Sequence, residues 1–373
     1  MDSSWLKSFQ AQFGKLTLKV SRTTCYREVK LTPLPHLNMK SKLLISILLI
    51  SYCHTLFAQA QPPSIPATDR IRLAEAFRLA DEIGDRVWQD WSKVPFAVLL
   101  VTPDYEFLVG HPKPSANFVR ARYDAFLKSD VYYRRRTFPI TFLATFPLDN
   151  TMISTVVVGP AENTWVKTST PWVITLLHEH FHQLQDAQPN SFADVNSLNL
   201  SHGDQTGMWM LNYPFPYDRK EVQDQFALMS RLLADAIRSP EVERSNKVRE
   251  YLQARRKFQA IISTDDYRYF SFQFWKEGVA RYTEYQVAQA AAAKYKPTKE
   301  FAALKDCRSF TDVAQSTYDA VINQLLTQRL GGSKREVVYS FGAGEALLLD
   351  TINPGWRNAY FTDKFDLAKF YPE

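Results

Sequence analysis

The stretch His178-Glu179-His180-Phe181-His182 decides the fold and the site that we expect from this sequence. His178 and His182 are four residues apart, so on an α-helix their imidazoles project from one face and can bind a single Zn²⁺ at roughly 2.0–2.1 Å. Glu179 lies beside that face, where its carboxylate can act as general base toward a metal-bound water. His180 points away from the pair, and we expect it to be packed.

The flanking residues predict a mostly buried helix over about 171–187. Thr170-Pro171 is typical of a helix start, because threonine can cap the first turn and proline fits the first helical position. Apolar residues then recur along the segment, at Trp172, Val173, Ile174, Leu176, Leu177, Phe181 and Leu184. Gln188-Pro189-Asn190 should end this helix.

A hydrolytic zinc site needs a third protein ligand and one open position. An aromatic-rich segment of about 267–291 is expected to be helical and offers Glu277 for that role. Glu284 lies two turns further along the same face, where its carboxylate can hold the free ring N–H of a ligating histidine. His202 is the alternative loop ligand or active-site donor, although a single loop histidine is more often solvated.

With these residues the chain resembles the gluzincins, the zinc peptidases that combine H-E-x-x-H with a distant glutamate. It is most similar to their aminopeptidase and leukotriene-hydrolase branch and its shorter relatives, whose E-G-x-x-x-Y-x-E pattern is matched by Glu277, Gly278, Tyr282 and Glu284. The resemblance implies Glu277 as third ligand, Glu284 as the carboxylate behind it, and a thermolysin-like two-lobe fold. The metzincins are excluded, because residues 183–189 lack the further histidine that they require.

Two shorter stretches extend the resemblance. Tyr339-Ser340-Phe341-Gly342-Ala343 is similar to the family's Y-x-x-G-a pattern, which implies that Tyr339 donates a hydrogen bond to the oxyanion of the tetrahedral intermediate. Gly159-Pro160-Ala161-Glu162-Asn163 is similar to its G-x-M-E-N loop, with Ala161 in place of methionine, which implies that Glu162 binds a free α-amino group. The alternatives are an ordinary packed tyrosine and a turn after a strand.

Residues 39–60 are predicted to be a secretory signal peptide with a basic start, a short apolar run and an A-x-A cleavage site at Ala58-Gln59-Ala60. The apolar run Leu43–Ile50 is too short for a stable membrane span. Residues 1–38 are then an extended leader or sequence upstream of the true start. We expect a secreted or periplasmic protein; lipid anchoring at Cys53 is the alternative, disfavoured by the bulky residue before it.

Without the leader, the charge of the chain is balanced. Of its 45 basic and 39 acidic residues, the leader through Ala60 holds 8 and 2, which leaves 37 of each in residues 61–373. Nucleic-acid binding is not expected, because the basic excess that marks such proteins is absent. Only Cys307 remains after the leader, so no intramolecular disulfide is expected. The expected partner is a peptide or protein substrate, and the oligomeric state stays open.

Local patterns predict an α+β fold with zinc in a cleft between two lobes. Residues 61–68 are a linker, and residues 69–190 form a lobe with a long first helix, a helical piece and strands, at 69–93, 118–128, 96–101, 105–109, 138–146 and 152–158. Residues 191–373 form a helical lobe, with helices near 218–238, 241–262, 267–294, 312–330 and 339–352. Relative to the family, residues 190–265 are an inserted helical block.

Two finer expectations concern the sheet. In gluzincins an edge strand binds the substrate backbone, and the resemblance assigns that role to Met152–Val158, with an unused edge as the alternative. The basic run Arg134-Arg135-Arg136 is expected to be a solvated loop rather than a carboxylate-binding patch.

The expected function is therefore a secreted zinc metallopeptidase in which His178, His182 and Glu277 bind Zn²⁺, Glu179 is the base and Tyr339 stabilises the oxyanion. Two alternatives stay open. One is an exported binding or scaffold protein on a gluzincin fold without turnover, against which the intact Glu179 argues. The other is a zinc hydrolase of a non-peptide amide or ester, which uses the same residues and differs only in substrate.

Overall fold

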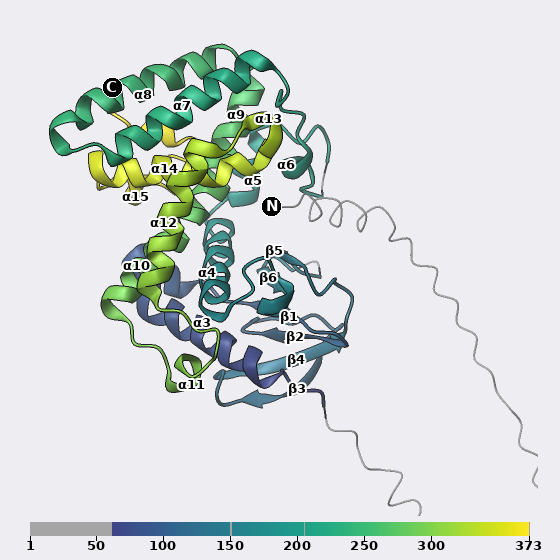
Figure 1. Cartoon of the computed structure of the whole chain (residues 1–373). Coiled ribbons are helices and arrows are strands. Elements are labelled where there is room, and N and C mark those ends of the chain that lie inside the picture. The colour runs from purple at the N-terminus through teal and green to yellow at the C-terminus, as the bar shows by residue number, and fades with distance from the viewer. Residues whose placement is uncertain (1–61, 150, 205, 373) are drawn as a thin grey trace, which may run out of the picture. The chain divides into compact units, whose positions relative to one another are not determined.

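A six-stranded mixed sheet occupies one end of the described chain (Figure 1). The computed structural model describes residues 62–149, 151–204 and 206–372, so the predicted leader, signal peptide and cleavage site lie outside the described residues. The strand order is β3-β4-β2-β1-β6-β5. The strands are β1 (Val98–Val101), β2 (Tyr105–Val109), β3 (Val119–Asp124), β4 (Ser129–Arg135), β5 (Leu143–Pro147) and β6 (Ser154–Val158). β1 and β6 are parallel, and the other neighbours are antiparallel.

Two long helices pack with the sheet. Helix α3 (Ala67–Val87), followed by a 3-10 turn at Trp91–Lys93, contributes Leu73, Leu79 and Ile83 to the core. Helix α4 (Ser169–Asp186) contacts α3, β5 and β6. All of its residues from Trp172 to Gln185 are buried, which is the pattern of a helix enclosed on all sides.

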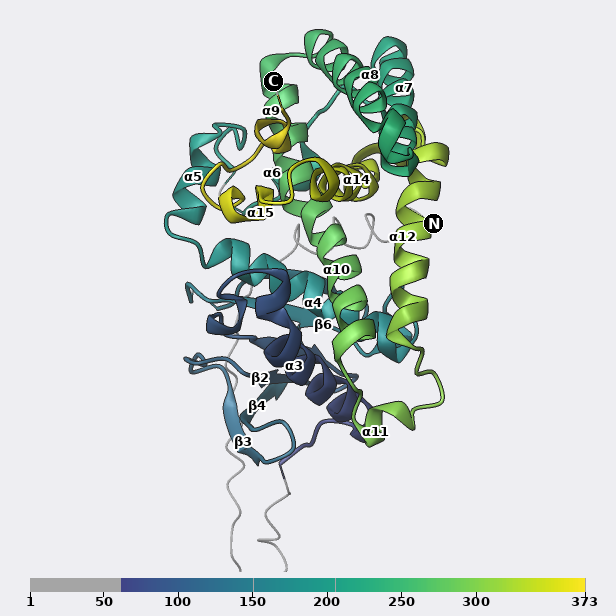
Figure 2. The same cartoon turned by 90° about the vertical axis from the view of Figure 1, so that its left-hand side faces the viewer.

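The remaining helices form what we call the helical region, residues 191–372. Its elements are α5 (Ser191–Ser197), α6 (Trp209–Asn212), α7 (Lys220–Arg238), α8 (Glu241–Ala260), α9 (Thr264–Gln273), a π-helical turn (Phe274–Gly278), α10 (Val279–Lys294), α11 (Lys299–Ala302), α12 (Phe310–Thr327), α13 (Leu330–Ser333), a 3-10 turn (Lys334–Glu336), α14 (Val337–Ile352), α15 (Trp356–Ala359) and a final 3-10 turn (Leu367–Phe370). Figure 2 shows α10 and α12 running from this region toward the helices α4 and α3, and α10 contacts both of them. Pro62–Glu373 therefore form one compact unit, in which α10 contacts α3, α4, α12 and α14.

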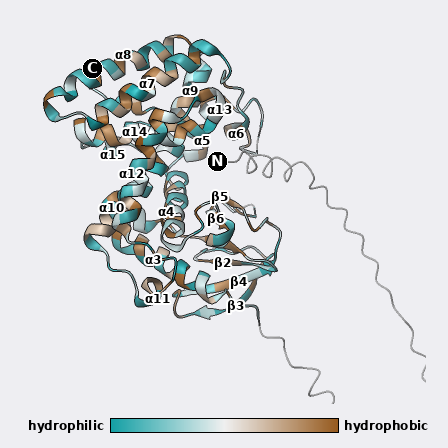
Figure 3. Ribbon diagram, in the orientation of Figure 1, coloured by the Kyte–Doolittle hydropathy of each residue, from teal (hydrophilic) through white to brown (hydrophobic). Residues whose placement is uncertain are grey.

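The α+β class and most of the expected helices are confirmed. Most of the described residues within 190–265 lie in helices α5 to α8, as expected, and α7 and α8 form a hairpin whose outer helix α8 is mostly hydrophilic (Figure 3). Among the described residues no helix is long and apolar enough to cross a membrane. The segment predicted as a linker is partly packed, because Ile65 is buried and α3 begins at Ala67.

The helical piece predicted for residues 118–128 is wrong, because the chain forms the hairpin of β3 and β4 there. The turn is held locally: the Asp124 carboxylate accepts hydrogen bonds from the backbone N–H groups of Phe126 and Leu127. Arg70 of α3 donates two more hydrogen bonds to the same carboxylate. The periodicity of this short polar segment is ambiguous, and these tertiary contacts determine that it forms a hairpin.

The edge strand was also placed wrongly. β6 lies between β1 and β5, so the segment predicted as Met152–Val158 is interior, and β5 is the edge strand on that side of the sheet. All five residues of β6 are buried, as a strand paired on both sides requires, whereas β5 is only partly buried. Sequence alone does not fix which of two neighbouring strands is outermost, because strand order depends on long-range pairing.

The basic run 134–136 is not a solvated loop. Arg134 and Arg135 belong to β4, and Arg134 bonds to Glu106 and Asp149. Arg136 donates hydrogen bonds to the carbonyl oxygens of Pro103 and Phe138. The run therefore holds the sheet to its flanking loops through charge-assisted hydrogen bonds.

Candidate metal centre

His178, His182 and Glu277 meet at the contact between α4 and the helical region. Their candidate ligand atoms lie within 4.8 Å of one another. The Oε2 atom of Glu277 is 3.3 Å from Nε2 of His182 and 4.0 Å from Nε2 of His178. Tetrahedral ligands at about 2.0–2.1 Å from zinc are separated by roughly 3.3–3.4 Å. The distance between Glu277 and His182 has this value, and the distance between Glu277 and His178 is longer.

Both histidines present the same ring nitrogen to this centre. Nδ1 of His178 lies 2.7 Å from Oε1 of Glu284, and Nδ1 of His182 lies 2.7 Å from Oε1 of Gln185. Each partner is an acceptor, so the Nδ1–H tautomer satisfies both contacts and leaves the lone pair of Nε2 free for a metal. The residues present could therefore hold a metal ion, and Glu284 has the position expected from the sequence.

The helix that carries the histidine pair is anchored at its first turn by a distant residue. It begins at Ser169, two residues before the predicted start, and its N-cap is Thr168 rather than Thr170. The Asp306 carboxylate accepts hydrogen bonds from the backbone N–H and the hydroxyl of Ser169, while the Thr170 hydroxyl donates to the Arg308 carbonyl. An acid at this end also interacts favourably with the helix dipole.

Glu277 is presented by a single π-helical turn between α9 and α10. Single π-helical turns are rare in proteins, and those that occur often lie at functional sites. The extra residue in such a turn changes which side chains share a face of the helix. Gly278 of this turn packs directly on Gly342 of α14: a Cβ added at Gly342 would come within 2.5 Å of the Phe274 carbonyl oxygen. The two glycines thus let α14 cross the π-helical turn at backbone contact, which brings Tyr339 and Arg335 beside Glu277.

Glu179 is not one of the candidate ligands, and its carboxylate contacts the edge strand of the sheet. Its Oε2 accepts a 2.7 Å hydrogen bond from the hydroxyl of Thr145, which belongs to β5. The same hydroxyl also lies 3.1 Å from the backbone carbonyl of Glu179. The side chain is thereby fixed between α4 and the edge strand, one residue along the chain from the ligand His178.

Tyr339 lies on α14 with its ring centroid 6.3 Å from that of His178. Arg335, one turn earlier, donates hydrogen bonds to the Tyr339 hydroxyl at 3.3 Å and to Oε1 of Glu277 at 2.9 Å. The predicted third ligand and the predicted oxyanion residue therefore share one guanidinium, and Tyr339 is brought to the site as expected.

The charges of the centre are strongly coupled. Burial by itself would raise the pKa of Glu277, but His182 and Arg335 hold the pKa of this carboxyl well below its usual range. Burial would likewise lower the pKa of His178, whereas its contact with Glu284 raises it. Burial raises the pKa of Tyr339 above its ordinary value, so this phenol stays protonated and able to donate.

Three candidates from the sequence do not join the centre. His180 is stacked between Phe96 and Trp91, and burial lowers its pKa to about 3, so it is a neutral packed residue as expected. His202 is exposed in its loop. Glu162 lies in a 3-10 turn at the start of α4 and bonds to Arg72 at 2.9 Å, with 62% of its side chain exposed. From Ser169 to His178 α4 rises roughly 13 Å, so Glu162 lies at the far end of this helix.

Four further residues of the site were not identified from the sequence: Thr145, Gln185, Arg281 and Arg335. Gln185 is three residues after His182, a helical spacing that a search for ligand partners would have found. Its amide donates to the Lys276 carbonyl and the Tyr360 hydroxyl. Arg281 donates to Oε2 of Glu284. Thr145 reaches the site only through strand order. Arg335 is four residues before Tyr339, a local spacing, but it reaches Glu277 only through the crossing of α14.

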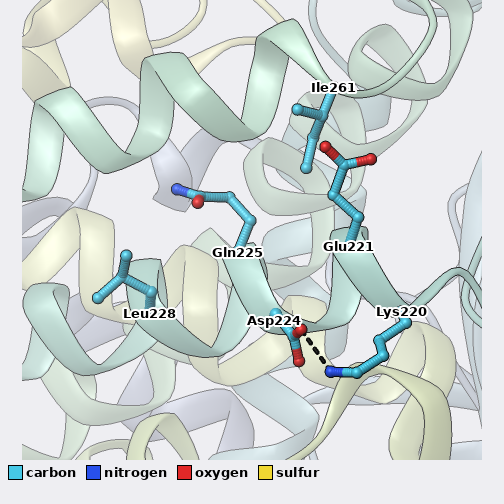
Figure 4. A pocket seen from close by; sticks show the side chains of 6 residues that line it. All are labelled: Lys220, Glu221, Asp224, Gln225, Leu228 and Ile261. Carbon is cyan, nitrogen blue, oxygen red and sulfur yellow. Dashed lines mark hydrogen bonds and ion pairs between the residues drawn. The ribbon is translucent and has the colours of Figure 1, made fainter.

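Two surface hollows lie apart from this centre. One lies beside α7 and is lined by Lys220, Glu221, Asp224, Gln225, Leu228 and Ile261 (Figure 4). Its polar side chains include the ion pair between Lys220 and Asp224. The other is formed by the segment around His202 and Trp209. Neither is lined by a residue of the metal centre, and we assign no role to them.

Comparison with known proteins adds no relative: no protein-family model, no curated protein and no solved structure matches this chain.

Proposed function

We propose that this chain is a zinc-dependent metallopeptidase of the gluzincin type, with a thermolysin-like arrangement of two lobes around the metal centre. The observation that carries the proposal is the Nε2–Nε2–Oε2 donor set of His178, His182 and Glu277, with both Nδ1 atoms engaged by acceptors. Zinc held there would act as a Lewis acid and lower the pKa of its water.

The residues around the donor set have the chemistry that hydrolysis needs. Glu179, held by Thr145, would take the proton of the attacking water and return it to the leaving amine. Tyr339 would donate its hydroxyl hydrogen to the oxyanion, an interaction that is stronger in the transition state than with the substrate carbonyl.

β5 is the proposed site of substrate backbone binding, in place of the segment expected from the sequence. The N–H of Gly159 donates to the Phe142 carbonyl, and Leu143 pairs with Val158. In an antiparallel pair the bonded positions alternate, so the backbone N–H and C=O of Thr145 point toward the outer edge of the sheet. A peptide added there would run past Glu179.

Cleavage inside a chain is the favoured mode. An aminopeptidase needs an anion for the substrate's free α-amino group, and Glu162 is engaged by Arg72 at the far end of α4. A library of peptides with free and with blocked N-termini tests this: we expect blocked peptides to be cleaved as well as free ones. Cleavage of free peptides alone would point to an exopeptidase, and hydrolysis of esters or small amides alone would favour the non-peptide alternative.

The test of the metal site is the zinc content of the purified protein, wild type beside Glu277→Ala. We expect about one zinc per chain in the wild type and much less in the variant, because three protein ligands are needed for a stable site. No zinc in the wild type would favour the scaffold alternative. Equal zinc in both proteins would mean that the third ligand lies elsewhere, with Glu284 and His202 to be tested next.

Export is part of the proposal, on the basis of the sequence alone. We propose cleavage near Ala60 and a secreted or periplasmic mature protein. Mass spectrometry of the protein recovered outside the cytoplasm should give an N-terminus at residue 61. A lipid-modified N-terminus at Cys53 would instead support the anchored alternative.

A further inference from the structure

Arg335 is a buried arginine, 7% exposed, whose guanidinium contacts two parts of the proposed site at once. Its Nη2 donates to Oε1 of Glu277 at 2.9 Å, and its Nη1 donates to the Tyr339 hydroxyl at 3.3 Å. Its Nε donates to the side-chain oxygen of Gln273 at 3.0 Å. The planar fork is therefore fixed on three sides, which a lysine ammonium cannot reproduce.

The contact with Glu277 divides the two oxygens of that carboxylate. Oε1 is occupied by Arg335, while Oε2 faces Nε2 of His182 and of His178. A carboxylate held in this way offers one oxygen to a metal rather than two. The position opposite is then kept open for water or substrate, as a hydrolytic site requires.

The contact with Tyr339 determines what the phenol can do. The hydroxyl oxygen accepts from a guanidinium, which has no acceptor of its own, so the phenolic hydrogen stays available for another group. A charge-assisted bond to the oxygen also makes the phenol a stronger donor. Arg335 thus orients the hydrogen that Tyr339 would give to the oxyanion.

The local backbone presents Arg335 for this double contact. Arg335 lies in the 3-10 turn that leads into α14, four residues before Tyr339, so the two side chains lie on one face. The preceding residue, Lys334, has a φ of 47°, an uncommon conformation for a residue with a side chain. The chain turns sharply there, directly before the residue that contacts Glu277.

A second buried arginine in the helical region provides a contrast. Arg255 is also nearly enclosed and pairs with Glu345 and Asp366, and its other partner is the Tyr267 hydroxyl. No histidine and no residue of the metal centre takes part in this network. Burial of an arginine beside carboxylates is therefore not specific to the metal centre. What distinguishes Arg335 is that its carboxylate partner, Glu277, also faces two histidines.

We propose that Arg335 is a positioning residue shared by the third metal ligand and the oxyanion tyrosine, so that metal binding and transition-state stabilisation depend on one guanidinium. This inference rests on the proposed function. It assigns to Arg335 two effects, one on zinc affinity through Glu277 and one on kcat through Tyr339.

The first test is zinc affinity, measured in the full chain by competition with a chromogenic chelator. Arg335→Lys keeps the charge and loses the fork, and we expect zinc affinity to fall about 10–100-fold, the usual effect of removing a group that orients a ligand. Arg255→Lys is the matched control: it changes an equally buried arginine and should leave zinc affinity unchanged. Affinity that is lowered equally by both substitutions would show a general effect on the core and overturn the proposal.

The second test is a double-variant cycle on kcat with Arg335→Lys and Tyr339→Phe. If Arg335 acts through Tyr339, the lysine substitution should cost at most about twofold in kcat once the phenol is gone, because independent sites add and coupled ones do not. If the fold losses in kcat of the two single variants multiply in the double variant, Arg335 does not act through Tyr339. KM should change less than kcat, which a loosened fold would not produce.

The outcomes separate this inference from the proposed function. A wild type without zinc and without hydrolysis would defeat both, whereas a wild type with zinc, hydrolysis and indifference to Arg335→Lys would defeat only the role of Arg335. Folding of the metal-free variants is checked by thermal unfolding, and Arg335→Gln serves if the lysine variant does not fold. If neither folds while Arg255→Lys does, Arg335 is a structural residue and the proposal fails.

Discussion

Helix α4 sets the spacing of His178 and His182 by itself, whereas Glu277, Arg335 and Tyr339 reach them only because α14 crosses the π-helical turn. The histidine pair needs nothing more than the helical repeat. The other three side chains come from residues 95 to 157 positions after His182 and depend on the contact between Gly278 and Gly342. One half of the site is therefore local in origin and the other half is tertiary.

This difference predicts that the two halves fail in different ways. Changes on α4 should remove the base or a ligand and leave the surrounding structure intact. Changes at the crossing should displace several groups together, because the contacts of α14 with the π-helical turn are shared.

The largest effect is expected from the local half. Glu179→Gln removes the proposed base but keeps the size of the side chain, so kcat should fall by about 10²–10⁴-fold. Zinc content should be unchanged, because Glu179 is not one of the three candidate ligands. Retained hydrolysis of a peptide by this variant, measured beside a zinc determination, would rule out the mechanism.

A somewhat smaller effect is expected for the hydroxyl supplied by the crossing. Tyr339→Phe should lower kcat by about 10²–10³-fold, the usual cost of losing one oxyanion donor, with zinc content and KM little changed. Tyr318→Phe, on α12, is a matched control and should leave the kinetics as they are. Equal kinetics in the two variants would mean that Tyr339 is an ordinary packed tyrosine and not the oxyanion donor.

Glu284 links the two halves, because it lies on α10 and bonds to His178 of α4. Glu284→Gln should lower zinc affinity about 10–100-fold, since the histidine loses the carboxylate that fixes its tautomer. Isothermal titration of zinc into the metal-free protein measures this. Unaltered affinity would mean that α4 alone orients the histidine.

Substitutions of two glycines of α14 should have the smallest effect on the site. They are also the sharpest test of the crossing. Gly342→Ala should destabilise the fold by about 1–3 kcal/mol, because its new Cβ would meet the Phe274 backbone and the helices must shift. Gly344→Ala meets only the flexible ends of Leu325, Leu233 and Ile237, and alanine favours the helix, so we expect little loss of stability. Urea unfolding compares the two.

The outcome for zinc sharpens this pair of variants. If the crossing positions Glu277, Gly342→Ala should weaken zinc binding in the folded protein while Gly344→Ala should not. Equal affinities would show that Glu277 is positioned by its π-helical turn alone.

Sequence by itself determined the local features of this protein. The helical repeat predicted the histidine pair, the neighbouring position of the proposed base Glu179 and the packed position of His180, because spacing along one helix is a local property. The spacing of seven between Glu277 and Glu284 likewise predicted one ligand and one supporting carboxylate on a common face, and the structure has both beside His178. The α+β class followed from the change in periodicity along the chain.

Only the tertiary structure decided how these parts meet. Strand order made β5 the edge and brought Thr145 to Glu179, and long-range contacts of Asp306 fixed the start of α4. The crossing at Gly342 brought Arg335 to Glu277, and the position of Glu162 beside Arg72 removed it from the site. Such contacts join residues far apart in the chain, and their formation depends on the packing of whole elements, which no local pattern of residues encodes.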